Sequence, residues 1–273
     1  MTQRSLSKQE ADLVLAWEWD KRRMITVDDM VKRLRCSNGS ARKIVYDLKK
    51  KGWLESLTKG HYLLIGADRG PRGVPAMNPY LVARVLPKSY FFAYRFACAH
   101  HGLLTQIPRV IHVAVRHSRQ PIEIKNVRFQ FVELTGKRFF GYQEATIMGE
   151  KVNVSDVERS ILDALDRPEL VGGVEAVAQV LFHAGKKLNT IRVLNYLQRF
   201  HDSALSRRFA YLSELLHIVL PPKLKSYLAG QVKKNPALLG SPKRWGTDGK
   251  LDKRWNLILN VPNNDLLGEV RIG

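Results

Sequence analysis

The first 65 residues contain three amphipathic helical segments followed by a short hairpin, and this order restricts the fold more than any other feature. The third segment is predicted to be a helix from about Gly39 to Lys51. Its apolar residues recur at the spacing i, i+3, i+4, i+7, which places them on one buried stripe: Ala41, Ile44, Val45 and Leu48. A helix with such a narrow apolar stripe leaves most of its circumference outside the core.

The outer face of this helix is cationic. Successive residues of a helix are rotated by about 100°, so Arg42, Lys43, Tyr46 and Lys50 are predicted to point away from the apolar stripe. Ser40 precedes them in the first turn. Side chains of these types contact phosphates and base edges in DNA complexes, and we therefore expect Ser40 to Tyr46 to read bases.

The segments around this helix complete a recognisable order. Ser7 and Thr26 are placed to cap two earlier helices, and Gly52 is predicted to end the third. The stretch "WLESLTKGHYLLI" then predicts a hairpin that turns at Gly60. This order is typical of a winged helix-turn-helix, whose second helix of the pair enters the DNA major groove. Lys59 and His61, at the hairpin tip, would contact the flanking backbone.

Winged helices also serve as protein-binding modules, and the charge of the chain favours DNA. The 273 residues contain 45 Lys and Arg against 25 Asp and Glu, a net charge of +20. Such an excess favours nucleic acid as partner, then an anionic membrane surface; a basic protein without either is the alternative. Residues 76–273 share the excess, with 29 basic and 16 acidic side chains.

Cysteine content and hydropathy predict a cytoplasmic protein. Cys36 and Cys98 are the only cysteines, which does not support a disulfide framework or a cysteine-based zinc site. The N-terminal stretch lacks the apolar region of a signal peptide, and no apolar run approaches membrane-spanning length.

The glycine- and proline-rich stretch Gly66 to Pro79 is the predicted domain boundary. We expect a winged helix over residues 1–68, a linker over 69–78 and a second domain over 79–273. In that domain, helical patterns over 79–86 and 90–103 precede strands over 110–117, 127–134, 145–148 and 151–154. Further helices are predicted over 155–166, 173–184, 190–200 and 203–219, with a late strand over 254–261. The fold class is therefore α+β, with a mixed or antiparallel sheet.

The candidate enzymatic motifs of the second domain are incomplete. Glu123 and Lys125 form half of a nuclease-type metal motif, but no Asp or Glu lies between Arg69 and Ile122 to complete it. His100 and His101 are adjacent on a predicted helix and point in different directions. No phosphate-binding loop or nucleophile elbow is present. We expect no catalytic residue, metal or cofactor.

Charged pairs in the second domain have structural and functional interpretations. Ser155 and Glu158 fit a capping box, and Arg159 with Asp163 fits an i, i+4 ion pair. Arg207 and Arg208 begin a helix that Ser203 is placed to cap, where cations are unfavourable against the helix dipole. That placement favours an anion-binding role for Arg207 and Arg208.

Several stretches in the second domain carry a resemblance to a known family. The sequences "AHHGLLTQIP", "GEKVNVSDVERSILDAL", "RPELVGGVEAV", "SRRFAYLSELL" and "KRWNLIL" occur in an order and spacing similar to those of the AbiEi family. Members of this family are the antitoxins of type IV toxin–antitoxin, or abortive-infection, systems. The resemblance extends from the N-terminal helices to about Asn260.

The resemblance implies an N-terminal winged helix, a C-terminal antitoxin domain, and repression of the protein's own operon at inverted repeats. It implies a functional partner, a nucleotidyltransferase-like toxin, which the antitoxin need not bind directly. Arg159, Arg207 and Arg208 would then lie on an antitoxin or anion-binding surface. Two alternatives stay open: an RNA-binding domain that protects the toxin's target, and a metal-dependent nucleic-acid enzyme.

Overall fold

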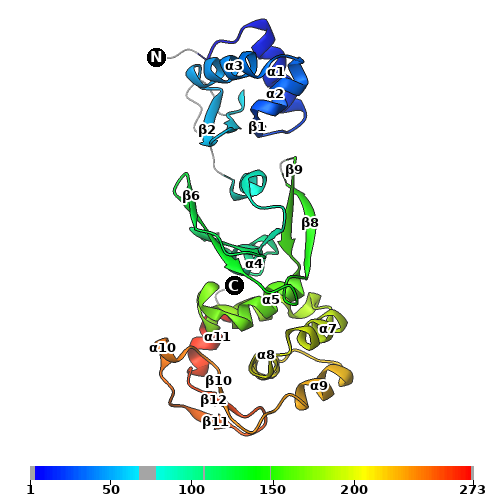
Figure 1. The fold of residues 1–273 in the computed structure, drawn as a ribbon. Helices are drawn as coiled ribbons and strands as arrows, with labels where there is room; N and C mark the ends of the chain where they lie inside the picture. The colour runs from blue at the N-terminus through cyan, green and yellow to red at the C-terminus, as the bar shows by residue number, and fades with distance from the viewer. Residues whose placement is uncertain (1–3, 68–77, 107, 148, 272–273) are drawn as a thin grey trace. The chain divides into compact units, whose positions relative to one another are not determined.

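The computed structural model describes residues 4–67, 78–106, 108–147 and 149–271, which form a mixed α+β fold (Figure 1). The chain divides into two compact units. The first comprises Met1–Lys88, Ile122–Val127 and Glu144–Val152, and the second comprises Ser89–Pro121, Arg128–Gln143 and Asn153–Gly273. The N-terminal unit therefore includes more than residues 1–68. Of the predicted linker, residues 69–78, only Asn78 is among the described residues.

The N-terminal unit begins with three helices and a three-stranded antiparallel sheet of order β1-β3-β2. Its elements are α1 (Lys8–Trp19), β1 (Met24–Thr26), α2 (Val27–Leu34), α3 (Asn38–Lys50), β2 (Leu54–Thr58) and β3 (His61–Leu64). The apolar residues of all three helices form one core with the sheet: Leu13, Val14, Trp17, Ile25, Met30, Ala41, Val45, Leu48, Trp53, Leu54 and Leu64.

Local sequence signals explain where these elements begin and end. The Ser7 hydroxyl accepts a hydrogen bond from the Glu10 amide, and Thr26 does the same for Asp29. In both cases the carboxylate of the later residue accepts from the backbone amide of the capping residue, which completes a capping box. Gly60 has a φ of +80°, as the tight turn between β2 and β3 requires. The predicted caps and the predicted hairpin are confirmed.

A short 3-10 helix, η2 (Pro79–Val85), joins the N-terminal unit through Leu81 and Arg84. Leu81 packs with Met24 and Leu63 in a small buried cluster. Arg84 donates to Asp29 at 3.0 Å and to Glu150 at 2.6 Å. These contacts explain why the first unit continues past the predicted boundary.

A six-stranded mixed sheet follows, in the order β6-β7-β5-β4-β9-β8. Strands β4 and β5 are antiparallel, whereas β5 with β7 and β4 with β9 are parallel. The bounds are β4 (Tyr90–Phe92), β5 (Val110–Val115), β6 (Ile122–Ile124), β7 (Val127–Glu133), β8 (Tyr142–Ile147) and β9 (Glu150–Ser155).

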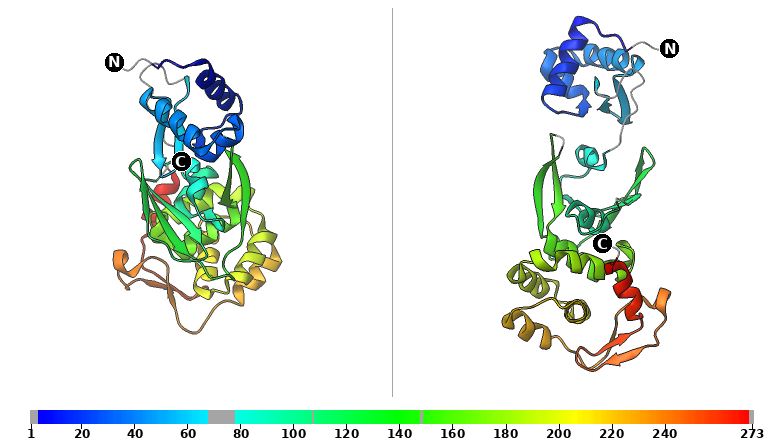
Figure 2. Two further views of the ribbon diagram at one scale, coloured as in Figure 1. Left: turned by 45° about the horizontal axis from the view of Figure 1, so that its top comes forward. Right: turned by 180° about the vertical axis from the view of Figure 1, so that it is seen from behind.

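In the second unit, helix α5 packs against α4, α6, α7 and α8 (Figures 1 and 2). The helices are α4 (Tyr94–His100), α5 (Val157–Asp166), η3 (Pro168–Leu170), α6 (Val174–Ala184), η4 (Gly185–Lys187), α7 (Thr190–Phe200), α8 (Ser203–Leu215), α9 (Pro222–Ala229), α10 (Pro242–Trp245) and α11 (Asn263–Arg271). A small sheet of order β10-β12-β11 completes the unit: β10 (Ala237–Leu238), β11 (Lys250–Asp252) and β12 (Leu257–Leu259).

The structure corrects several predicted elements of this unit. Tyr90–Phe92, predicted as helix, is the buried strand β4, since a short apolar run fits either state. Asp156, and not Ser155, caps α5, and Asp202, and not Ser203, caps α8. The helices α9, α10 and α11 were not predicted. Among the helices that the structure describes, none has both the length and the apolar character needed to cross a bilayer.

Candidate nucleic-acid interface

Helix α3 packs into the N-terminal unit through its apolar stripe. Ala41, Val45 and Leu48 are buried, and the neighbouring Ile44 is half-buried. The Ser37 hydroxyl caps the helix by accepting from the Ser40 amide at 3.2 Å. The remaining circumference of α3 therefore faces away from the core.

The outer face of α3 is exposed and basic. Arg42, Lys43, Tyr46 and Lys50 are all exposed, and the Tyr46 side chain keeps 65% of its accessible surface. Among the described residues, no acidic side chain forms an ion pair with Arg42, Lys43 or Lys50. We call this set, with Ser40, the α3 face.

Several other cations of the N-terminal unit are neutralised by acids of the same unit. Arg22 contacts Asp29 at 2.5 Å, and Lys51 contacts Glu10 at 2.6 Å. The ion pair of Lys125 with Glu55 belongs to the same unit. Lys8 and Lys32, on α1 and α2, are also exposed and have no ion-pair partner among the described residues, so the α3 face is distinguished by gathering three such cations on one helix surface.

The β2–β3 hairpin adds one further free cation. Lys59 is exposed in the turn, with no ion-pair partner among the described residues. His61 is half-buried, and its Nδ1 lies 3.3 Å from the Thr58 hydroxyl and 3.2 Å from the Lys59 carbonyl oxygen. This ring nitrogen interacts within the turn, so Lys59 is the better placed of the two for an external contact.

Sequence reasoning missed Lys49 on this helix. Lys49 is exposed, and its Nζ lies 5.9 Å from the centre of the Tyr62 ring. It follows Arg42 by seven residues, close to two full helical turns, so both side chains lie on one side of α3. Extending the helical-wheel argument by one turn would have identified it.

Arg159 does not lie on a surface, which corrects the expectation for this residue. Its side chain is 1% exposed and its Nε donates to Asp163 at 2.8 Å, as the i, i+4 spacing predicted. Its Nη1 donates to the carbonyl oxygens of Arg138 and Phe140. The guanidinium also packs against three aromatic rings: Phe91, Phe140 and Phe200. Arg159 is therefore a core residue that ties α5 to neighbouring segments.

The environment of Asp163 confirms how deeply this pair is buried. Burial raises the pKa of the Asp163 carboxyl to about 6, although the nearby Arg159 charge acts in the opposite direction.

The predicted capping box of Ser155 and Glu158 is not formed. Glu158 instead accepts from the Asn189 amide at 2.9 Å and from Arg192 at 3.0 Å.

Arg207 and Arg208 also turn inward, contrary to the predicted anion-binding role. Arg207 is 4% exposed, and its Nη1 donates at 3.0 Å to the carbonyl oxygens of both Asn235 and Asn256. The Arg208 Nε donates at 2.8 Å to the Leu238 carbonyl oxygen. Burial lowers the pKa of both guanidinium groups. Backbone carbonyls here take the place predicted for an anion.

This arrangement changes the expected result of removing the two arginines. Arg207→Ala with Arg208→Ala is expected to destabilise the chain by about 2 kcal/mol or more, because charge-assisted hydrogen bonds to several carbonyls are lost. Urea unfolding followed by circular dichroism measures this. Lys187→Ala, an exposed site on the same unit, is the control and should change stability by less than about 0.5 kcal/mol. An unchanged stability of the double variant would contradict the internal role.

The His100 and His101 rings, predicted to point in different directions, instead meet edge to face with 4.9 Å between their centroids. His101 Nε2 lies 2.6 Å from the Ser155 carbonyl oxygen, and burial lowers the pKa of His112. In the described part of the chain, no group of three or more His, Cys, Asp or Glu side chains is arranged to hold a metal ion.

Comparison with known proteins finds a similar fold and identifies no activity. No family model and no curated protein matches the chain. Among solved structures, the chain is similar to the crystal structure of the RV2827C protein from Mycobacterium tuberculosis. The TM-score is 0.68 at 17% sequence identity, and the match covers 98% of this chain and 97% of the other. At this identity the likeness shows a shared overall fold.

Proposed function

We propose that this protein is a DNA-binding transcriptional regulator whose N-terminal unit is a winged helix-turn-helix. The observation that carries the proposal is the α3 face, an exposed set of cations without internal partners on the second helix of a helical pair. The element order α1-β1-α2-α3-β2-β3, with a hairpin after α3, supports the same reading.

The proposed mechanism is non-covalent. Lys43, Lys50 and Lys59 neutralise phosphates, and the residues from Ser40 to Tyr46 contact base edges in the major groove. The +20 net charge supports long-range attraction to DNA and predicts a strong dependence on salt.

We further propose that the regulated DNA is the inverted repeat of its own promoter and that the protein is a cytoplasmic type IV antitoxin. This step rests on the AbiEi-like motifs described above. Co-expression with a nucleotidyltransferase-like toxin encoded by the adjacent gene tests it. Rescue of growth by this protein supports the antitoxin role, and growth arrest that persists at full expression contradicts it.

Lys50→Ala distinguishes phosphate contacts from base contacts. This change is expected to weaken binding to all DNA sequences alike and to reduce the slope of log K against log salt by about one unit. Fluorescence-anisotropy titrations of promoter and scrambled DNA over a range of salt concentrations measure both effects. Lys8→Ala, an exposed site at the start of α1, should leave the slope unchanged. A loss confined to promoter DNA would instead make Lys50 a base-reading residue.

A further inference from the structure

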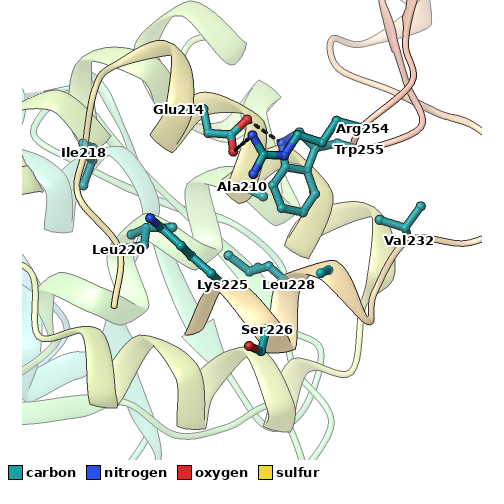
Figure 3. A pocket seen from close by; sticks show the side chains of 11 residues that line it. Ala210, Glu214, Ile218, Leu220, Lys225, Ser226, Leu228, Val232, Arg254 and Trp255 are labelled. Atoms are coloured by element: carbon teal, nitrogen blue, oxygen red, sulfur yellow. Dashed lines mark hydrogen bonds and ion pairs between the residues drawn. The ribbon is translucent and has the colours of Figure 1, made fainter. Parts of the chain in front are cut away.

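The second unit contains a cavity that plays no part in the proposed DNA contact. Its volume is about 620 Å³, within the range that holds small ligands or anchoring side chains. Helices α8 and α9 and the segment around Trp255 surround it (Figure 3). Most of its wall is aliphatic: Ala210, Ile218, Leu220, Leu228, Ala229 and Val232.

The polar side of the cavity is internally paired. Glu214 accepts from the Trp255 Nε1 at 2.8 Å and forms an ion pair with Arg254 at 2.9 Å. Figure 3 shows this group across the hollow from Lys225 and Leu228. Lys225 is exposed and has no acidic partner in the described part of the chain. The aliphatic wall of the cavity is thus bordered by Lys225, a cation with no acidic partner among the described residues.

The sequence around the cavity is strongly basic. Residues 210–256, which include the whole cavity lining, contain nine Lys and Arg but only three acidic side chains. Two of the three are already engaged, since Glu214 pairs with Arg254 and Asp252 accepts from the Trp255 amide at 2.7 Å. The exposed cations include Lys223, Lys225, Lys233, Lys234 and Lys253. A partner that fits this region must carry negative charge around an apolar group.

We propose that this cavity is a docking site for an acidic segment of a partner protein, which inserts one large apolar side chain. The aliphatic wall matches a leucine or phenylalanine side chain, and the surrounding lysines match flanking carboxylates. A nucleobase fits less well, because Trp255 is 5% exposed and offers little ring face for stacking. This site is separate from the α3 face and does not depend on DNA binding.

The test uses the full chain and short fluorescein-labelled peptides in which a central residue is flanked by glutamates on both sides. Peptides with central phenylalanine or leucine are expected to bind about tenfold more tightly than the peptide with central alanine. Replacing the flanking glutamates by glutamine should also weaken binding by about tenfold. Fluorescence anisotropy measures each affinity.

Two variants connect the binding to the cavity. Ala229→Phe fills the hollow from an exposed position on α9, and Lys225→Glu reverses the charge at its edge. Each variant is expected to lower the affinity for the phenylalanine peptide by about tenfold. Lys187→Glu, a matched charge reversal outside the cavity, should leave this affinity unchanged. Circular dichroism confirms that each variant is folded, and Ala229→Phe should bind promoter DNA like the wild type.

Two results would overturn the proposal. The first is equal affinity for phenylalanine, leucine and alanine peptides, because the cavity would then hold no anchor. The second is displacement of the peptide by single-stranded RNA, together with unchanged affinity of the Ala229→Phe variant for the phenylalanine peptide. That result would make the region a basic nucleic-acid surface. Loss of promoter binding by the α3 variants leaves both results unaffected, so the two proposals fail independently.

Discussion

Arg42→Ala combined with Lys43→Ala is expected to weaken promoter binding and to reduce its selectivity over other DNA while leaving the protein folded. Both side chains are exposed on α3 and neither has an ion-pair partner among the described residues, so the folded state loses little. The protein–DNA complex loses a phosphate contact and, where Arg42 is bidentate to guanine, about 1–3 kcal/mol of discrimination at one base pair. The single Arg42→Ala change should relax preference at that position alone.

Competition titrations with promoter and scrambled DNA measure this loss of selectivity. Lys8→Ala with Lys32→Ala removes the same charge from exposed positions on α1 and α2 and serves as the control. The control should retain its preference for the promoter. Retention of full preference by the Arg42 and Lys43 double variant would show that α3 does not read the sequence.

Arg159→Ala is expected to destabilise the second unit by about 3–5 kcal/mol, the cost of leaving one partner of a buried ion pair unpaired. The Asp163 carboxylate would lose its only close cation within hydrogen-bond distance among the described residues, and two backbone carbonyls would lose a donor. Urea unfolding of the full chain measures the effect. Lys187→Ala, at an exposed site of the same unit, is the control and should cost less than about 0.5 kcal/mol.

A double replacement separates packing from charge at this position. Arg159→Met with Asp163→Leu exchanges the pair for apolar side chains of similar size and should recover much of the lost stability. Unchanged stability of Arg159→Ala, together with weakened nucleic-acid binding, would contradict the core role and restore the surface role first expected.

The helices and the hairpin of the first 65 residues were predictable from sequence because their signals are local. Ser7 and Thr26 each precede an acidic residue by three positions, and Gly60 lies where a turn needs a positive φ. These features act within a few residues of chain. Periodicity then places Ala41, Val45 and Leu48 inward, which leaves the basic residues of α3 outside.

The interior of the second unit was less predictable because its partners are distant in sequence. Arginine is rarely fully buried, so sequence alone places Arg159 and Arg207 at the surface. Arg207 is buried because two later segments bring the carbonyl oxygens of Asn235 and Asn256 to it. The cavity beside α9 has the same origin, since its wall combines residues from 210 to 255.

Footprinting of the purified full chain on the DNA upstream of its own gene tests the proposed regulator most directly. We predict protection of an inverted repeat at protein concentrations that leave scrambled DNA of equal length unprotected. The Arg42→Ala, Lys43→Ala double variant should give no such protection. Even protection along both DNAs, or none on either, would contradict a sequence-specific regulator that reads its own promoter through α3.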